Sequence, residues 1–113
     1  MRARSEVLLW AAQRVSAMLL ALCIAVHLAT IVYAVRHGLT AAEILARTRG
    51  NGLCAGFYAL FVLMVAVHAP IGLRTVLGET FGWRGNSLDG FTLAVGVALA
   101  LTGWRAVYAV VIG

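Results

Sequence analysis

Charged residues are scarce in this chain, and two long stretches lack them altogether. Residues 15–35 and 53–73 are each 21 residues long and contain no aspartate, glutamate, lysine or arginine. An α-helix rises about 1.5 Å per residue, so each stretch spans about 30 Å, which is the thickness of the hydrocarbon core of a bilayer. A third apolar run, residues 91–112, has a similar length and carries a single charge, on Arg105. These three runs predict three transmembrane helices.

The overall composition excludes an ordinary soluble domain. Apolar residues make up 63% of the 113 residues and the mean hydropathy is +0.96, whereas a small soluble domain needs many polar residues to cover its large surface. In lipid, only helices and closed barrels satisfy their own backbone, and three segments cannot close a barrel. We therefore expect an all-α membrane protein, a single domain over residues 1–113, with helices at about 8–35, 53–77 and 90–112.

Paired cysteines, membrane-embedded acids and lysines are also lacking. Cys23 and Cys54 lie in different predicted helices without CxxC spacing, so they are interpreted as apolar packing residues. A small multidrug-type transporter needs a carboxylate within the membrane, but all four acids lie outside the apolar spans: Glu6, Glu43, Glu79 and Asp89. The net charge of +5 comes from nine arginines that form no contiguous basic stripe, which argues against nucleic-acid binding.

The segments outside the spans carry a few local signals. Arg14 interrupts the first apolar region, and the run that follows exceeds the ~7–15 residues of a signal peptide, so cleavage is not expected. Thr40 and Glu43 have the spacing of a capping box, which predicts a short surface helix over residues 41–47. The second connection is expected at residues 78–90, at the level of the lipid headgroups.

The distribution of arginines and aromatic residues says little about orientation. The arginines divide five to four between the two sides, which barely favours a cytoplasmic N-terminus. The aromatic side chains fit belts at both membrane interfaces without choosing between them: Trp10 and Trp83 on one side, and Tyr33, Tyr58, Trp104 and Tyr108 towards the other.

Four ionisable residues are candidates for function because such groups are costly inside a membrane: Arg14, His27, His68 and Arg105. A neutral imidazole binds haem iron or another metal through a ring nitrogen. A lone buried histidine is more often a hydrogen-bonded structural residue. Here, however, each histidine is the one ionisable group in the middle of its span, which favours cofactor and metal ligation by His27 and His68.

The depths of the two histidines indicate that they do not share one haem. His27 lies ~4–5 Å beyond the midpoint of the first span, and His68 lies ~7–8 Å past the midpoint of the second span in the opposite direction. The offset along the membrane normal is therefore ~12 Å, whereas the two axial ligands of one haem lie at similar depth. Each histidine would need a ligand from another chain, so we expect this chain to be part of a hetero-oligomeric helix bundle.

Other residues beside the histidines have both functional and ordinary interpretations. Pro70 removes a backbone hydrogen bond and usually kinks a helix, and Gly72 would allow close approach to a flat macrocycle, although both residues are common in membrane helices. Arg14 and Arg74 lie at the same membrane face and could hold haem propionates or polarise a quinone carbonyl. Alternatively, their guanidinium groups reach lipid phosphates, which is the favoured interpretation of Arg105.

Two segments together resemble a known family. QRVSAMLLALCIAVH (residues 13–27) and HAPIGLR (residues 68–74) are similar to the cytochrome b membrane anchor subunit of succinate dehydrogenases and fumarate reductases. That family carries Arg-[hydrophobic]-Ser/Thr near the start of its first helix and His-x-x-x-Gly-[Ile/Leu]-Arg in its second. Its members are three-helix subunits of about this size, so the resemblance covers nearly the whole chain.

The resemblance implies a role for each matching residue. His68 corresponds to the axial ligand of haem b, and Arg14 to the arginine that serves the quinone site and the haem propionates. Gly72 and Arg74 complete the second motif. His27 is placed as in members with two haems, where the first helix supplies a ligand to the second haem. A cytoplasmic N-terminus in a bacterial inner membrane is also implied.

Some positions depart from the family pattern. Some members place a serine that contacts quinone four residues before the arginine, where this chain has Trp10. A histidine often precedes the arginine, where this chain has Gln13, and Thr75 replaces a histidine after Arg74. Ser16 is therefore a candidate for the quinone site on weaker grounds.

The resemblance implies a non-catalytic subunit of a succinate:quinone oxidoreductase. Electrons from succinate would pass through a flavoprotein subunit and an iron–sulfur subunit to quinone, beside one haem b or two, and a second membrane anchor subunit would supply further haem ligands. The chain has no flavin, nucleotide or cluster motif, so it is not expected to oxidise succinate alone. The alternative is a haem-free anchor or scaffold whose histidines pack or relay protons.

Overall fold

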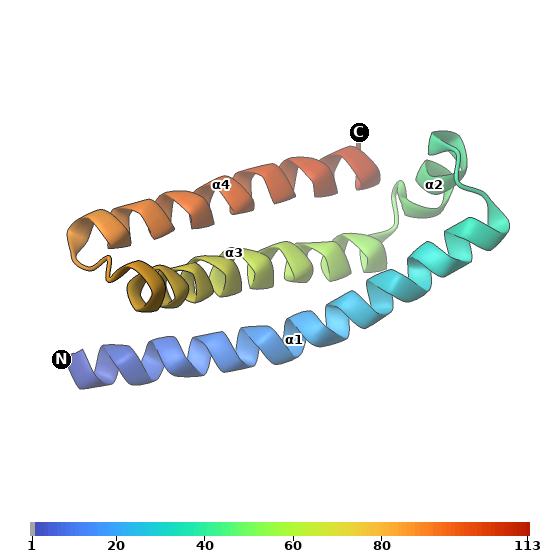
Figure 1. Cartoon of the computed structure of the whole chain (residues 1–113). Coiled ribbons are helices and arrows are strands. Elements are labelled where there is room, and N and C mark those ends of the chain that lie inside the picture. Colours follow the sequence, from blue (N-terminus) through green and yellow to red (C-terminus); the bar gives the residue numbers. More distant parts are fainter. Residues whose placement is uncertain (1) are drawn as a thin grey trace.

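The computed structural model describes residues 2–113, which form four helices and contain no strand (Figure 1). They are α1 (Arg2–His37), α2 (Ala41–Thr48), α3 (Gly52–Phe81) and α4 (Asn86–Val111). Three of them, α1, α3 and α4, are long and apolar enough to cross a bilayer. The predicted all-α membrane fold with three spans is confirmed.

The long helices extend past the bounds expected from hydropathy. α1 begins at Arg2 instead of about residue 8, and α3 continues to Phe81 instead of about residue 77. α4 begins at Asn86, so the second connection, expected at 78–90, is reduced to residues 82–85. Hydropathy locates the part of a helix that lies in lipid, but backbone hydrogen bonds continue the helix into the aqueous boundary.

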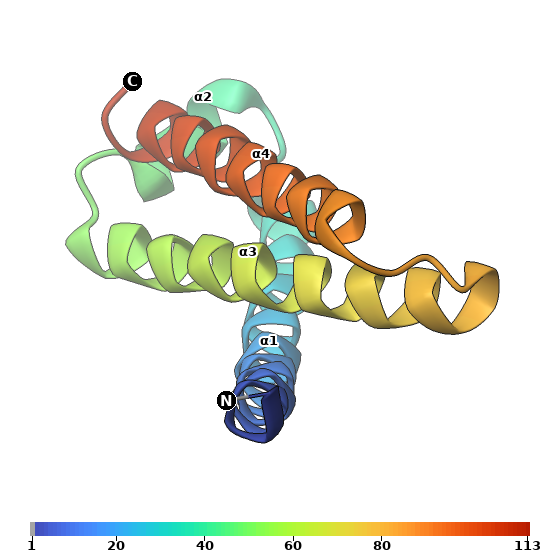
Figure 2. The same cartoon turned by 90° about the vertical axis from the view of Figure 1, so that its left-hand side faces the viewer.

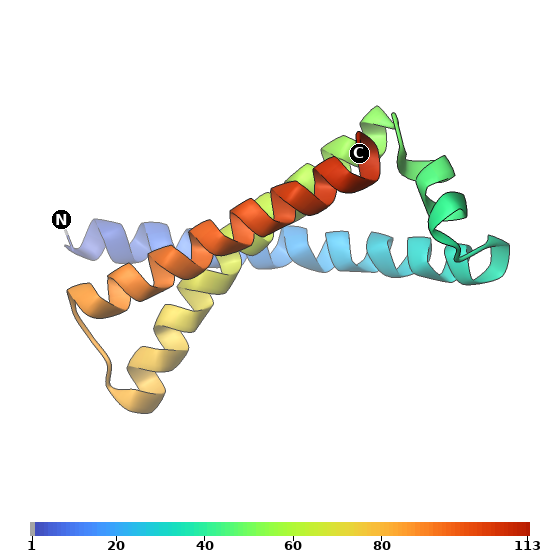
Figure 3. The ribbon, with the colours of Figure 1, turned by 90° about the horizontal axis from the view of Figure 1, so that it is seen from above.

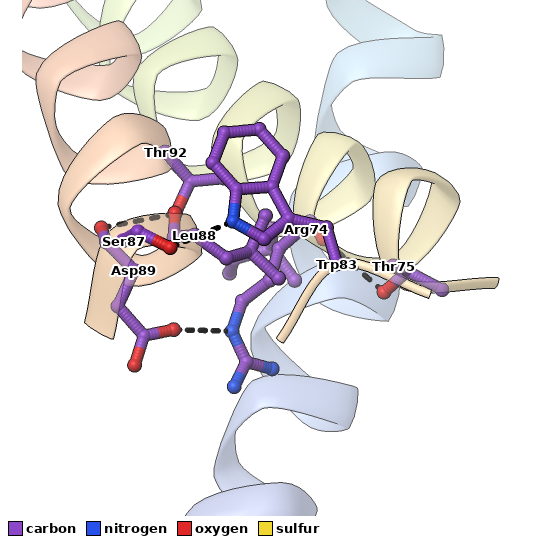
Figure 4. Close-up of polar contacts among 8 residues, drawn as sticks. Arg74, Thr75, Trp83, Ser87, Leu88, Asp89 and Thr92 are labelled. Carbon is purple, nitrogen blue, oxygen red and sulfur yellow. Dashed lines mark hydrogen bonds and ion pairs between the residues drawn. The ribbon is translucent and has the colours of Figure 1, made fainter. Parts of the chain in front are cut away.

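Local chemistry sets the short turn between α3 and α4. Gly82 ends α3 in the left-handed region (φ 66°), which costs glycine little, and its N–H donates to the carbonyl of Gly78 at 3.0 Å. The Trp83 indole N–H then donates to Ser87 Oγ in the first turn of α4 at 2.8 Å (Figure 4). Its ring stacks on Phe91 with 5.3 Å between centroids.

α3 is the central helix of the chain. It contacts both α1 and α4, and it lies between them in Figure 1. Figures 2 and 3 show that α1 is inclined to the α3–α4 pair, so the three spans diverge and do not form a tight parallel bundle. Most side chains on the three spans are consequently only half-buried or exposed.

Two glycines allow α4 to approach α3 closely. A Cβ at Gly103 would lie only 2.5 Å from Val62 Cγ1, and a Cβ at Gly96 would lie 3.2 Å from Pro70 Cγ and 3.3 Å from the carbonyl oxygen of Ala66. That carbonyl is the one whose helical donor Pro70 removes. Pro70, for which the sequence leaves a functional and an ordinary interpretation open, packs against Gly96 of α4 within this chain.

The face of α1 that packs on α3 repeats at helical spacing. Ser16, Leu20 and Cys23 are 2%, 7% and 3% exposed, and the free thiol of Cys23 is buried among them. Positions 16, 20 and 23 lie along one stripe of a helix, and His27 continues it one turn further. The stripe brings the first candidate histidine against α3.

The short helix α2 is held at its start and near its end. Thr40 Oγ1 accepts from the backbone N–H of Glu43 at 3.2 Å, as the capping box predicts, but the Glu43 carboxylate accepts from the Thr40 hydroxyl at 2.8 Å instead of reaching the backbone. Thr48 Oγ1 donates to the carbonyl of Val110 at 2.7 Å, which ties α2 to the C-terminal end of α4.

Candidate functional site

His27 is hydrogen-bonded to a tyrosine of the neighbouring helix α3. Its Nδ1 lies 3.0 Å from the hydroxyl of Tyr58 on α3, and the two rings meet edge to face with centroids 5.6 Å apart. Phe61, one turn further along α3, also meets the imidazole edge to face at 5.6 Å. Tyr58, which was assigned to an interfacial aromatic belt, thus has a partner inside the chain.

A cavity of about 570 Å³ opens beside this pair. His27 and Tyr58 contribute to its wall together with residues of α2, α3 and α4, and nearly all of that wall is apolar. Thr48 and Thr102 are its other polar side chains. The arrangement suits a large apolar group that is recognised at one imidazole.

His68 lies elsewhere on α3 and has no partner within the described residues. Its Nδ1 is buried and makes no hydrogen bond there, and the same holds for Oε1 of Gln13 on α1. A buried polar atom without a partner costs about 1–3 kcal/mol, so these two atoms stand out among the described residues.

The structure separates the two imidazoles along the bundle, as predicted. His27 contacts Tyr58, and His68 lies ten residues further along α3 than Tyr58, which corresponds to about 15 Å of helix. One planar group cannot be ligated by both side chains of this chain. Across residues 2–113, moreover, no three side chains from among histidine, cysteine, aspartate and glutamate come together as a metal site.

Arg14 and Arg74 line one hollow of about 350 Å³ between the N-terminal half of α1 and the C-terminal half of α3. The Arg14 guanidinium lies over the ring of Trp10, 4.9 Å from its centroid. Arg74 Nε donates to the carboxylate of Asp89 at 2.8 Å, and both side chains are about half exposed (Figure 4). Two cations, one of them anchored, therefore face a common space, which the carboxylate-bearing Glu6 also lines.

The sequence model of the succinate dehydrogenase/fumarate reductase transmembrane subunit family matches residues 1–109. The chain belongs to this family. No individual curated protein and no solved structure matches the chain in the corresponding comparisons. The protein is thus a multi-pass membrane subunit of a succinate dehydrogenase or fumarate reductase complex, in agreement with its three apolar spans.

The remaining residues proposed for the anchor subunit's site fall in different surroundings. Ser16 is 2% exposed and donates to the carbonyl of Gln13 at 3.1 Å, on the face of α1 that packs on α3. Two residues correspond to about 200° of helical rotation, so Ser16 points away from Arg14 and does not line the hollow. Gly72 faces α1, where a Cβ would lie 3.1 Å from Gln13 Nε2.

Arg105 lies towards the other end of the anchor subunit. It is exposed and lines an open groove of about 910 Å³ between α3 and α4, together with Trp104 and Tyr108. This position agrees with a guanidinium at the membrane boundary and is distant in sequence and structure from the Arg14–Arg74 hollow.

Two residues of these sites were missed from the sequence, namely Tyr58 and Asp89. Tyr58 was one aromatic residue among several, and its role depends on which side of α3 meets α1. From the sequence, Asp89 is only one of four acids outside the spans, with nothing to single it out as a partner of Arg74. The turn at residues 82–85 brings Asp89 back to Arg74, and a search for charge pairs across the short connection would have found it.

Proposed function

We propose that this anchor subunit binds haem b through His68 and contributes Arg14 and Arg74 to the quinone site of the complex. The observation that carries the proposal is the buried Nδ1 of His68, which makes no hydrogen bond within the described residues. No internal hydrogen bond competes for the imidazole of His68, and Nε2, the ring nitrogen that is not buried, is open to iron. The residue chemistry therefore fits a haem that His68 and a residue of a partner chain would hold together.

A second haem at His27 is part of the same proposal. Nδ1 of His27 is engaged by Tyr58, so Nε2 is the nitrogen left for a metal, and the neighbouring cavity is apolar. The separation of about 15 Å along α3 requires two different haems if both histidines ligate. The second ligand of each would come from a second membrane anchor subunit.

Arg14 and Arg74 suit the recognition of an anionic or carbonyl oxygen. Guanidinium groups stay charged and donate in a planar fork, which matches a haem propionate or a quinone carbonyl. Asp89 engages Arg74 at Nε, which leaves the terminal Nη groups of that side chain for such an oxygen. Haem supplies one-electron chemistry when bound, while these residues bind and orient its polar edge and the quinone.

The proposal extends to the partners and the membrane. The flavoprotein subunit would oxidise succinate, and the iron–sulfur subunit would deliver electrons at the Arg14–Arg74 side of the membrane. We place the chain in a bacterial inner membrane with its N-terminus in the cytoplasm. The supporting observation is that both arginines line the hollow beside the first turns of α1, together with Glu6 and Trp10.

A haem-free anchor or proton-relay scaffold is the second candidate. The observation in its favour is the His27–Tyr58 hydrogen bond, because it gives one imidazole a structural partner inside the chain. This alternative gives no reason for the unpartnered nitrogen of His68.

An absorption spectrum of the purified complex separates the two candidates. After reduction, the wild-type complex is expected to show a haem α-band, and His68→Ala is expected to remove the band of the haem that His68 binds. His37→Ala is the matched control, because His37 is exposed at the end of α1, where its Nδ1 is hydrogen-bonded to the backbone carbonyl of Tyr33. A wild-type spectrum without haem bands, or an unchanged His68→Ala spectrum, contradicts the proposal.

A further inference from the structure

The contacts of His27 fix its ring more firmly than packing alone would. The Tyr58 and Phe61 rings lie within 10° of parallel, and the imidazole stands at 88° to the first and 80° to the second. The 3.0 Å contact between Nδ1 and the Tyr58 hydroxyl adds a directional bond to these two edge contacts. The bond joins α1 to α3 within the part of the chain that lies in lipid.

We propose that Tyr58 is a positioning residue that prepares His27 to ligate haem iron through Nε2. This inference rests on the proposed second haem. In a neutral imidazole one ring nitrogen carries the proton and the other holds a lone pair. When the Tyr58 oxygen accepts from Nδ1–H, the lone pair is on Nε2, which is the tautomer that a metal ligand requires.

A tyrosine hydroxyl suits this task better than a backbone carbonyl would. A hydroxyl both donates and accepts, so Tyr58 satisfies Nδ1 in the ligated tautomer and also in the other tautomer, before a metal is present. Nδ1 of the half-buried His27 therefore has a partner in either tautomer, in contrast to Nδ1 of His68. Tyr58 holds the imidazole of His27 in place beside the apolar cavity while the subunits assemble.

The bond also has an electronic consequence for the bound iron. Donation from Nδ1–H raises the basicity of the imidazole, and a more basic ligand favours ferric over ferrous iron. Loss of the hydroxyl is therefore expected to shift the midpoint potential of the His27 haem upward. The His68 haem, about 15 Å away along α3, is expected to keep its potential.

The test compares four forms of the whole purified complex: wild type, Tyr58→Phe, His27→Ala and Tyr108→Phe. Tyr108→Phe is the matched control, because it is the same substitution at an exposed tyrosine of α4. Haem content is measured relative to flavin, each haem is titrated by optical redox potentiometry, and the low-spin haem signals are recorded by electron paramagnetic resonance.

Wild type is expected to carry two haems, and His27→Ala is expected to lose one of them. Tyr58→Phe is expected to keep both, with an upward shift of one midpoint potential and a changed resonance signal for that haem alone. Tyr108→Phe is expected to match wild type. If Tyr58→Phe does not assemble, 3-fluorotyrosine incorporated at position 58 keeps the ring and weakens the acceptor, so a smaller shift in the same direction is expected.

Two different results would overturn the inference. If His27→Ala loses a haem but the position-58 variants titrate as wild type does, His27 is a ligand and Tyr58 does not position it. If wild type holds one haem that His27→Ala retains, the proposed second haem is wrong and the Tyr58 inference falls with it. The proposal for His68 is unaffected in either case.

Discussion

Replacing Gly103 with alanine tests whether close approach of α4 to α3 stabilises the anchor subunit. The new Cβ would lie 2.5 Å from Cγ1, 2.8 Å from Cγ2 and 3.2 Å from Cβ of Val62. Rotation of the valine does not relieve the overlap, because both methyl groups and the branching carbon are close and valine has one preferred rotamer in a helix. The helices must therefore separate.

The magnitude follows from the distances. Carbon atoms pack best at about 3.5–4.0 Å, so the helices must separate locally by about 1 Å. Overpacking of this kind costs about 1–3 kcal/mol, while alanine recovers about 1 kcal/mol of helix propensity relative to glycine. The matched control is Gly90→Ala in the same helix, where a Cβ meets nothing within 4 Å. The two variants should therefore differ by about 1–3 kcal/mol, with Gly103→Ala the less stable.

Thermal unfolding of the purified complex is the measurement. Gly103→Ala is expected to melt below wild type and below Gly90→Ala. Adding Val62→Ala removes both methyl groups, so the double variant is expected to recover stability relative to the sum of the single changes, with a coupling of about 1 kcal/mol or more. The reasoning is refuted if Gly103→Ala melts together with Gly90→Ala, or if Val62→Ala gives no such recovery.

Three further changes probe other contacts. Asp89→Asn weakens the ion pair that anchors Arg74, which is half exposed and worth about 1 kcal/mol at most. The KM for quinone is therefore expected to rise while the haem content stays unchanged. An unchanged KM contradicts the assignment of Arg74 to the quinone site. Thr48→Val removes the bond to the Val110 carbonyl, worth about 1 kcal/mol, so faster hydrogen exchange of the α2 amides is expected. Gly82→Ala places a side chain at φ 66° and is expected to cost about 1–2 kcal/mol, read as a lower melting temperature.

The identity and depth of the candidate residues could be predicted from the sequence. An imidazole in an apolar stretch is conspicuous, and a rise of about 1.5 Å per residue converts position into depth, so the sequence predicts different depths for His27 and His68. Arg14 and Arg74 were placed at one membrane face by the same argument, and the structure brings both to one hollow. Thr40 was identified as the cap of α2 because its bond is local in sequence.

The rotation of each helix about its axis was not predictable. Membrane helices pack in a solvent as apolar as their own side chains, so hydropathy does not distinguish a residue that faces lipid from one that faces a neighbouring helix. Ser16 shares a motif with Arg14 yet points into the α1–α3 contact, and Tyr58 bonds His27 instead of facing the headgroups.

The sequence alone determined that the chain spans the membrane three times and that its histidines lie at separate depths. The first property depends on the free energy of transferring side chains from water to lipid, and the second on the rise per residue of a helix. Both quantities add up over consecutive residues, so they can be calculated from the sequence. Only the tertiary structure decided that His27 has a hydroxyl partner, that Nδ1 of His68 has none in the described chain and that Asp89 anchors Arg74. These contacts depend on which faces of two helices meet, and that is a property of pairs of surfaces.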